Sequence, residues 1–206
     1  MSVLTKNEIL EELRKGQSAE GLVITPLLNG INDVGTSSVD LHLGHEFIVF
    51  RKARVTSINI ARSQEVAKNI NKYQEKVRIS RGQTFILHPH QLVLGASIEY
   101  ISLPGNIAAT IEGRSTWGRT GLVIATATKI DPGFKGCPTL ELVNEGEVPL
   151  VLYPGLCVAQ IILTKTHKTT EYKGTYYYAT GPEFPKLLKE FHNLLPFYKP
   201  DSSEPA

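Results

Sequence analysis

Cysteine is scarce in this chain of 206 residues, which contains only Cys137 and Cys157. Two cysteines do not make a disulfide framework, and these two lack the close spacing of a zinc site. We therefore expect both to be small buried hydrophobic residues. A chain with so few cysteines is typical of the reducing cytoplasm.

The sequence also lacks a strong charge of either sign, because 22 Lys and Arg nearly balance 20 Asp and Glu. A formal net charge of +2 gives no broad basic surface for nucleic acid. No apolar run approaches the ~20 residues that cross a membrane. The polar N-terminus does not resemble a secretion signal. We expect a cytoplasmic protein with neither a nucleic-acid nor a membrane partner.

A regular alternation of strands and helices is missing as well, which argues against a Rossmann fold. From Val77 onward, short apolar stretches are separated by turns that contain Gly, Pro or Asn. Strands at a spacing of roughly 8–12 residues predict a mostly β fold, either a sandwich or a barrel.

Two stretches before Val77 differ from this pattern. Residues 4–15 are predicted to form a helix, because Thr5 and Glu8 make a capping box ahead of an apolar stripe and Gly16 follows it. Residues 51–76 are polar and have no clear period, so we expect a long excursion with some helix.

The C-terminal part changes character after about residue 165. Residues 171–180 are polar and rich in tyrosine, a Gly-Pro pair follows, and residues 186–195 can form a short helix. We expect residues 1–165 to form one β domain with its N-terminal helix. Residues 166–206 are expected to form an arm and tail that can close over a site as a lid.

Groups suited to a nucleotide are concentrated in the middle of the chain. Arg114 and Arg119 bracket the hydroxyls of Ser115 and Thr116, and Glu141 lies inside an apolar strand, where a carboxylate is costly to bury. A guanidinium can pair two phosphate oxygens at once. Two other interpretations stay open: the arginines as ordinary surface residues, and the glutamate on the solvent face of an edge strand.

Five motifs in matching order resemble the dCTP deaminase family, which belongs to the trimeric dUTPase superfamily. They are Gly35-Thr-Ser-Ser-Val-Asp-Leu, Gln83-Thr-Phe-Ile-Leu-His-Pro, Glu112-Gly-Arg-Ser-Thr-Trp-Gly-Arg, Ile130-Asp-Pro-Gly-Phe-Lys-Gly and Thr139-Leu-Glu-Leu-Val-Asn. The resemblance implies a distorted, dUTPase-like β-barrel and a homotrimer with sites between subunits. It also implies zinc-independent conversion of dCTP to dUTP and ammonia in pyrimidine deoxynucleotide metabolism, with Mg²⁺ bound through the triphosphate.

The residues themselves agree with a zinc-independent reaction. Zinc deaminases carry His-x-Glu and Pro-Cys-x-x-Cys signatures, which this chain lacks. A carboxylate must then move the protons, and Glu141 is the candidate because partial burial raises a glutamate pKa into a useful range. The resemblance places the catalytic glutamate at the same position, with Arg119 to orient it and Ser115 to hold the water or the amino group.

The resemblance further implies a set of nucleotide-binding residues and no protein ligand for a metal. The set is Arg114, Thr116, Thr126, Ala127, Asp131 and Gln160, with Tyr172 and Lys173 standing in for a phosphate clamp that this arm otherwise lacks. Each has an ordinary structural alternative. Asp131, for example, precedes Pro-Gly and can simply start a turn.

Three alternative functions stay open. Thr128 stands where the family's monofunctional and bifunctional members differ, so the chain can also be a dUTP pyrophosphatase acting through Asp131, alone or after deamination. A non-catalytic nucleotide-binding regulator is the second alternative. The third, a cupin-like metal-binding barrel, is weak because the histidines lack the cupin spacing; they are His42, His45, His88 and His90.

Overall fold

The computed structural model describes residues 2–16, 21–51, 58, 72–167 and 174–186. The chain divides into two compact units, Met1–Ile48 with Lys76–Glu183 and Val49–Glu75 with Phe184–Ala206. Most of the described elements lie in the first unit. The predicted helix at 186–195 and most of the excursion at 51–76 lie outside the described residues. The predicted boundary at residue 165 stays a prediction.

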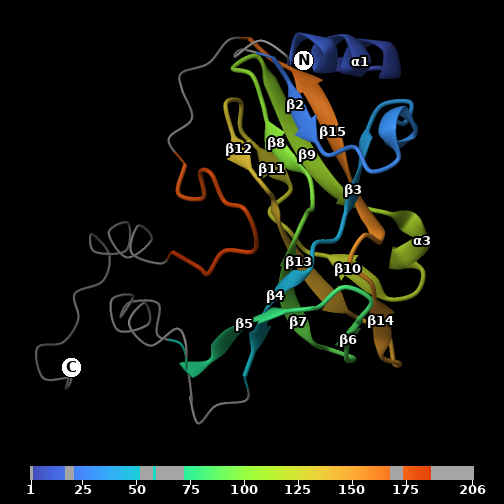
Figure 1. Cartoon of the computed structure of the whole chain (residues 1–206), viewed down its shortest axis with the longest axis vertical. Helices are drawn as coiled ribbons and strands as arrows, with labels where there is room; N and C mark the ends of the chain where they lie inside the picture. Colours follow the sequence, from blue (N-terminus) through green and yellow to red (C-terminus); the bar gives the residue numbers. More distant parts are fainter. Residues whose placement is uncertain (1, 17–20, 52–57, 59–71, 168–173, 187–206) are drawn as a thin grey trace, which may run out of the picture. The chain divides into compact units, whose positions relative to one another are not determined.

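The described strands form two larger and two smaller sheets (Figure 1). The first sheet has the order β1 (Ser2–Val3), β15 (Cys157–Lys165), β9 (Ile107–Gly113), β11 (Lys129–Ile130), and β15 also pairs with β3 (Val39–His42). The second has the order β10 (Leu122–Ile124), β13 (Thr139–Asn144), β7 (Leu92–Ala96), β4 (Glu46–Phe50), β5 (Gln74–Arg78). The smaller sheets are β12 (Lys135–Gly136), β8 (Tyr100–Ser102), β2 (Val23–Thr25), and β14 (Leu150–Leu152) with β6 (Phe85–Leu87).

The expected mostly β class is therefore confirmed, but the expected barrel needs a correction. Within the described residues no sheet closes into a barrel, because each strand order ends at edge strands instead of joining back on itself. Helices are short and few in this part of the chain: α1 (Lys6–Lys15), the 3-10 helix η1 (Gly30–Asp33) and α3 (Ser115–Gly118). Among these residues, no helix has the length and apolar character needed to cross a membrane.

The N-terminal helix forms where the sequence predicts it. Glu8 accepts hydrogen bonds from the backbone N–H of Thr5 at 2.8 Å and from its hydroxyl at 2.7 Å. This arrangement satisfies donors that the helix start leaves unpaired. Gly16 caps the other end, with its N–H 3.1 Å from the carbonyl of Glu12. Ile9 is fully buried and attaches the helix to the core.

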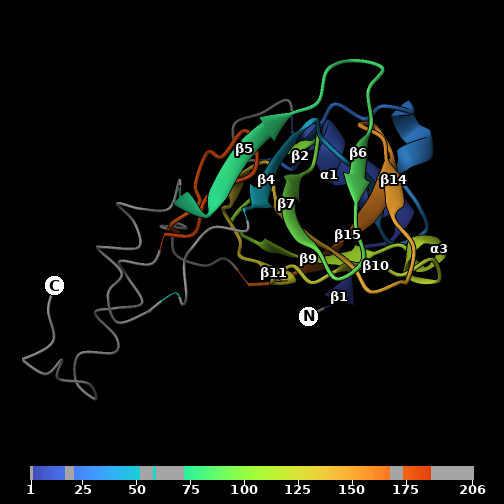
Figure 2. The ribbon, with the colours of Figure 1, turned by 90° about the horizontal axis from the view of Figure 1, so that it is seen from below.

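Strand β13 is an inner strand of the second sheet, with β10 on one side and β7 on the other. Leu140 and Leu142 are fully buried, and Glu141 between them points to the opposite face because side chains alternate along a strand. Phe47 of β4 stacks on Phe85 of β6, with ring centroids 4.3 Å apart. Seen from below, β9, β11 and β15 run along one side of the first unit (Figure 2).

A β-bulge interrupts the pairing of β15 with β3. Gln160 is opposite Asp40, whereas Cys157 is opposite His42, so three positions on β15 span two on β3. Bulges re-aim side chains and are frequent next to functional sites. Because directly opposed residues share a face, Cys157 and Gln160 both project to the side that carries Asp40 and His42.

The described part of the C-terminal arm returns to β12. The N–H of Tyr178 donates to the carbonyl of Lys135 at 2.7 Å, and the N–H of Cys137 donates to the carbonyl of Ala179 at 2.7 Å. Gly136 lies between these contacts, and a Cβ there would come within 3.0 Å of the Ala179 nitrogen. The arm therefore needs glycine at this position, while its action as a lid stays a prediction.

Candidate active site

Glu141 is held by its backbone, and its carboxylate has no partner among the described residues. Its N–H donates to Thr126 Oγ1 at 2.8 Å, and its carbonyl accepts from the N–H of Ala125 at 2.8 Å. Within the described residues, no hydrogen bond or ion pair reaches the half-buried carboxylate. Burial raises the pKa of the Glu141 carboxyl above its ordinary value. A carboxyl with a raised pKa is suited to accept and return protons as a general acid–base.

The predicted partners of Glu141 lie on one short helical turn. Ser115 begins α3, Thr116 follows, and Arg119 ends the turn with its N–H 3.1 Å from the carbonyl of Ser115. All three side chains are exposed. In the described part of this single chain, no hydrogen bond or ion pair joins them to the Glu141 carboxylate, so the roles assigned to these residues stay predictions.

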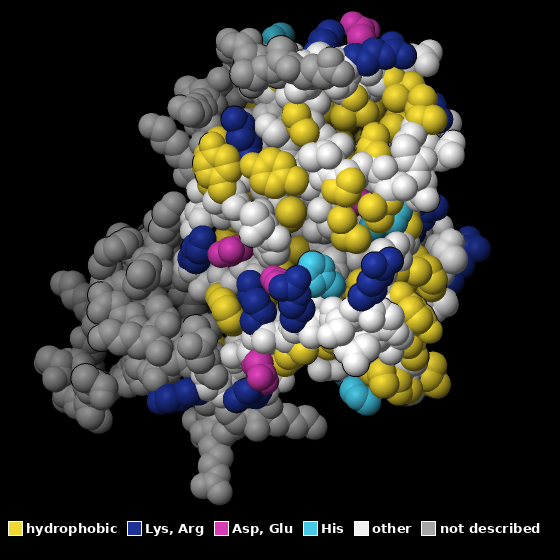
Figure 3. Space-filling model, viewed as in Figure 1, with side chains coloured by type: hydrophobic (Ala, Val, Ile, Leu, Met, Phe, Trp, Pro, Cys, Tyr) yellow, Lys and Arg dark blue, Asp and Glu magenta, His cyan; other side chains and the backbone are white. Residues whose placement is uncertain are grey.

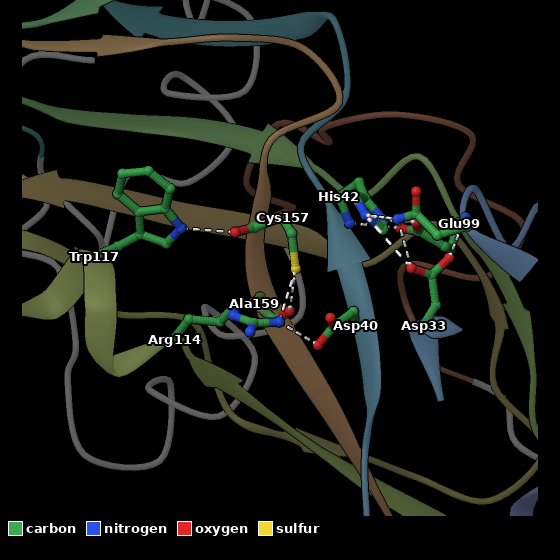
Figure 4. Close-up of polar contacts among 9 residues, drawn as sticks. Asp33, Asp40, His42, Glu99, Arg114, Trp117, Cys157 and Ala159 are labelled. Carbon is green, nitrogen blue, oxygen red and sulfur yellow. Dashed lines mark hydrogen bonds and ion pairs between the residues drawn. The ribbon is translucent and has the colours of Figure 1, made fainter. Parts of the chain in front are cut away.

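Arg114 is anchored where β9 leads into α3 (Figure 4). Its Nη1 atom lies 2.5 Å from Asp40 Oδ1 on β3 and 3.1 Å from Cys157 Sγ on β15. The Trp117 indole N–H donates to the carbonyl of Cys157 at 2.7 Å and holds α3 against the same strand. The expected burial holds for Cys137, whereas Cys157 is only half-buried and makes a polar contact.

Gln160 has a polar partner in Ser38, the residue that precedes strand β3. The Ser38 hydroxyl donates to Gln160 Oε1 at 3.0 Å, and both side chains are partly buried. The structure therefore brings the two phosphate-binding candidates Gln160 and Arg114 to the region of β3. Sequence reasoning assigned no role to Ser38 or Asp40, although both lie in the Gly35–Leu41 motif and alternate with buried Val39 and Leu41.

Asp131 forms the turn that its sequence context suggests. The N–H of Phe134 lies 3.2 Å from the carbonyl of Asp131, and Gly133 between them has a φ of 83°, as a type II turn requires. Its exposed carboxylate pairs with Lys129 at 2.8 Å. Ala127 is exposed. The nucleotide-binding roles of Asp131 and Ala127 stay predictions.

Tyr172 and Lys173, the predicted clamp substitutes, lie outside the residues that the structure describes. No group of three or more His, Cys, Asp or Glu elsewhere in the described chain is arranged to hold a metal ion. The structure thus offers no resident metal centre in those parts.

The structure also contains a buried polar cluster that sequence reasoning missed. His42 Nδ1 lies 2.7 Å from Glu99 Oε1, and His42 Nε2 lies 3.8 Å from Asp33 Oδ1 (Figure 4). Burial raises the pKa of the Glu99 carboxyl, while hydrogen bonds from His42 act in the opposite direction. Each of these three side chains is almost completely buried, so the cluster is a structural element of the core.

The surface drawn in Figure 3 carries acidic and basic side chains next to one another. This mixture agrees with the small net charge of the chain.

The described part of the chain is thus an antiparallel β protein in which strand β13 carries a half-buried carboxylate. The family model for dCTP deaminase-like proteins matches residues 3–166, which is most of the chain. The chain therefore belongs to the dCTP deaminase-like family.

Known proteins of this family resemble the chain over most of its length. A dCTP deaminase of Halorubrum lacusprofundi is 40% identical over 79% of this chain and 77% of its own. A dCTP deaminase of the dUMP-forming type from Methanobrevibacter smithii is 37% identical over 79% of each chain.

Among solved structures, the 2′-deoxycytidine 5′-triphosphate deaminase of Agrobacterium tumefaciens matches with a TM-score of 0.59. The match covers 80% of this chain but 48% of that one, so this chain spans about half the length of that protein. At 20% identity, this likeness concerns the fold alone.

Proposed function

We propose that this protein is a dCTP deaminase that converts dCTP and water to dUTP and ammonia. The observation that carries the proposal is Glu141, a half-buried carboxylate with a raised pKa on a strand whose backbone is fixed on both sides. The chain's membership in the dCTP deaminase-like family supports dCTP as the substrate. Both cysteines are unpaired, which supports a cytoplasmic location. The conversion of dCTP to dUTP would give the protein a part in pyrimidine deoxynucleotide metabolism.

In the proposed reaction, water adds to C4 of the cytosine ring while its proton passes to the Glu141 carboxylate. Glu141 passes this proton to N3, which completes the addition. Glu141 then accepts the proton of the new C4 hydroxyl and delivers it to the amino group, which leaves as ammonia while the oxygen at C4 becomes a carbonyl. Arg119 orients the carboxylate and Ser115 holds the water. A positioned acid–base of this kind supplies roughly 10²–10⁴ in rate.

Mg²⁺ enters this proposal as part of the substrate, bound to the triphosphate. Arg114, Thr116 and Gln160 contribute donors to the phosphates, which Mg²⁺ partly neutralises. We propose that no zinc ion takes part. Removal of Mg²⁺ is expected to raise the KM for dCTP, whereas a zinc-selective chelator is expected to leave turnover unchanged; inactivation by that chelator would contradict the carboxylate mechanism.

We further propose that the active protein is a homotrimer and that each site combines Glu141 of one subunit with Ser115 and Arg119 of the next. Two observations support this arrangement. Ser115 and Arg119 are exposed, and no described residue of the same chain pairs with the Glu141 carboxylate. Groups that act on a neighbouring subunit are expected to lie open in the isolated chain.

A second candidate is a bifunctional enzyme that also hydrolyses dUTP to dUMP and pyrophosphate. The observation that favours it is the relative from Methanobrevibacter smithii, whose name describes it as dUMP-forming. Its 37% identity to this chain is close to the 40% identity of the Halorubrum lacusprofundi relative, whose name is dCTP deaminase alone. In this reading, the exposed carboxylate of Asp131 positions the attacking water.

One experiment tests the proposed function and separates the two candidates. Purified protein is incubated with Mg²⁺ and dCTP, and ammonia, dUTP, dUMP and pyrophosphate are resolved over time. Deamination predicts equal amounts of ammonia and dUTP, and the bifunctional reaction predicts dUMP and pyrophosphate instead. The absence of ammonia would contradict both. A second incubation with dUTP would then distinguish a dUTP pyrophosphatase, which releases dUMP and pyrophosphate, from a non-catalytic nucleotide-binding regulator.

A further inference from the structure

Strand β3 and the residue before it contact both phosphate-binding candidates of the proposed site. Asp40 is the direct register partner of Gln160 across the β3–β15 pair. Ser38 lies two positions earlier, so its side chain is on the same side of the chain. A hydrogen bond from the N–H of Gly35 to the carbonyl of Ser38, at 2.8 Å, closes the turn ahead of β3 and fixes Ser38 in place.

The contacts of Arg114 use one nitrogen of its guanidinium group and leave the others. Nη1 carries two N–H groups, and its two neighbours are Asp40 Oδ1 at 2.5 Å and Cys157 Sγ at 3.1 Å. Nε and Nη2 carry the remaining three N–H donors, and no described residue accepts from them. These two nitrogens form the flat fork that pairs with two oxygens of one phosphate.

Of the two acceptors, Asp40 is the one that carries charge. Burial raises the pKa of the Cys157 thiol to about 11, so it remains neutral at physiological pH. Asp40 therefore supplies the directional ion pair, and its side chain is 28% exposed against 39% for Arg114. The bulge in β15 is what turns Cys157 to this side.

The contact of Gln160 with Ser38 likewise fixes one end of a side chain and leaves its N–H donors available. Its Oε1 accepts from the Ser38 hydroxyl at 3.0 Å. Because the oxygen end of the amide is held by a hydroxyl, the NH₂ end with its two donors is turned away from Ser38. Gln160 thus has its amide oxygen against Ser38, and Arg114 has its Nη1 against Asp40. The remaining N–H donors of both side chains are directed away from these partners.

We propose that Ser38 and Asp40 are positioning residues that aim Gln160 and Arg114 at the triphosphate of the substrate. This inference rests on the proposed function. Neither residue touches the reacting atoms; each acts through the side chain that it holds. The benefit is geometric, because a donor that is already aimed loses less freedom when the phosphate binds.

The test measures Asp40→Asn and Ser38→Ala on the full-length enzyme. Each variant is expected to raise the KM for dCTP by about tenfold, because misplaced positioning groups commonly cost one to two orders of magnitude. kcat is expected to change by less than about twofold, since Glu141 is untouched. The inhibition constant of deoxycytidine, which has no phosphate, is expected to stay the same.

A double-mutant cycle gives the sharpest reading. In an Arg114→Ala background, Asp40→Asn is expected to have no further effect on KM, because its only route to the phosphate has gone. Glu147→Gln removes one exposed negative charge elsewhere on the chain and is the matched control. Thermal unfolding of each variant checks that it is folded. If Asp40→Asn does not fold, the KM of Ser38→Ala tests the inference.

Three results would overturn the inference. An unchanged KM would mean that no aiming is needed, and a lower KM would mean that Asp40 mainly repels the phosphates. An equal loss of dCTP and deoxycytidine affinity would mean a general structural role. Failure of the wild-type protein to deaminate dCTP is a separate result, which would contradict the proposed function and not the contacts.

Discussion

The Glu141 carboxylate determines how activity should depend on pH. Burial raises its pKa, so its ionised form is lost at a higher pH than that of an ordinary glutamate, near 4.3. If the carboxylate accepts the proton of water, kcat/KM falls as pH falls through this raised value. We expect the acidic limb of the kcat/KM profile for dCTP to lie clearly above the ordinary glutamate pKa. A limb at or below that value would contradict the assigned role.

The same pKa shift predicts that Glu141→Gln does not destabilise the protein. A carboxyl whose pKa is raised on folding contributes stability below its unfolded pKa, and this contribution is lost as pH rises through the folded pKa. An amide stays neutral throughout. In urea titrations, the variant is expected to gain stability relative to wild type as the pH is raised from about 4 to 8. Glu147→Gln, at an exposed position, is the control and should show no such trend.

The apolar residues around Glu141 predicted that this glutamate lies inside a strand, but no pattern predicted the long-range contacts described above. Leu140 and Leu142 flank Glu141 and are fully buried, and the structure leaves the glutamate half-buried on the other face. The contact of Ser38 with Gln160 joins residues 122 positions apart, which no local pattern encodes. The cluster of His42 and Glu99 spans 57 positions and was missed for the same reason.

At the scale of an element, the end of β13 depends on Asn144. The fully buried amide donates to the carbonyls of Leu87 at 3.0 Å and Val148 at 2.8 Å, and its oxygen accepts from the N–H of Gly146 at 2.9 Å. This side chain therefore joins β13 to the end of β6 and to the following turn.

Replacing this amide tests how strongly the element depends on it. Asn144→Asp removes both donors and places a carboxylate against two carbonyls, so we expect it to cost about 2–4 kcal/mol of unfolding free energy. Urea denaturation measures the change, with the exposed Glu145→Gln as control. A loss under about 0.5 kcal/mol would show that water replaces the amide contacts without cost.

Helices and strands could be predicted where several local signals agree. Prediction failed where tertiary contacts determine where an element begins or ends. The capping box of Thr5 and Glu8 predicted α1, and alternation predicted β13. Strand β7 ends at Ala96, and Glu99 turns into the core to accept from the backbone N–H of His42 at 2.9 Å, a contact that no local pattern encodes. The short helix α3 was not predicted, since one helical turn carries no periodic signal.

At the scale of the whole molecule, the proposed trimer with shared sites predicts complementation. Glu141→Gln and Arg119→Ala are each expected to be inactive alone. In a randomly mixed trimer of the two variants, about one quarter of the sites receive an intact Glu141 and an intact Arg119. Denaturing and refolding the two together should therefore recover about one quarter of the wild-type turnover of dCTP.

The control for this mixture is Glu141→Gln refolded with itself, which should stay inactive. The mass in solution, measured by light scattering, is expected to be three times the 22.7 kDa of one chain. A mixture that stays inactive although trimers form would mean that each site lies within one subunit. The family resemblance implied this arrangement, but no local residue pattern predicts it, because it depends on how exposed surfaces of separate chains meet.

The central claim is that Glu141 moves the protons of dCTP deamination, and comparing wild type with Glu141→Gln tests it most directly. Ammonia release from dCTP and the Kd for dCTP are measured on both proteins. We predict that the variant binds dCTP about as well as wild type but releases ammonia roughly 10²–10⁴ times more slowly. Ammonia release within about tenfold of wild type would contradict the claim and remove Glu141 from the reaction.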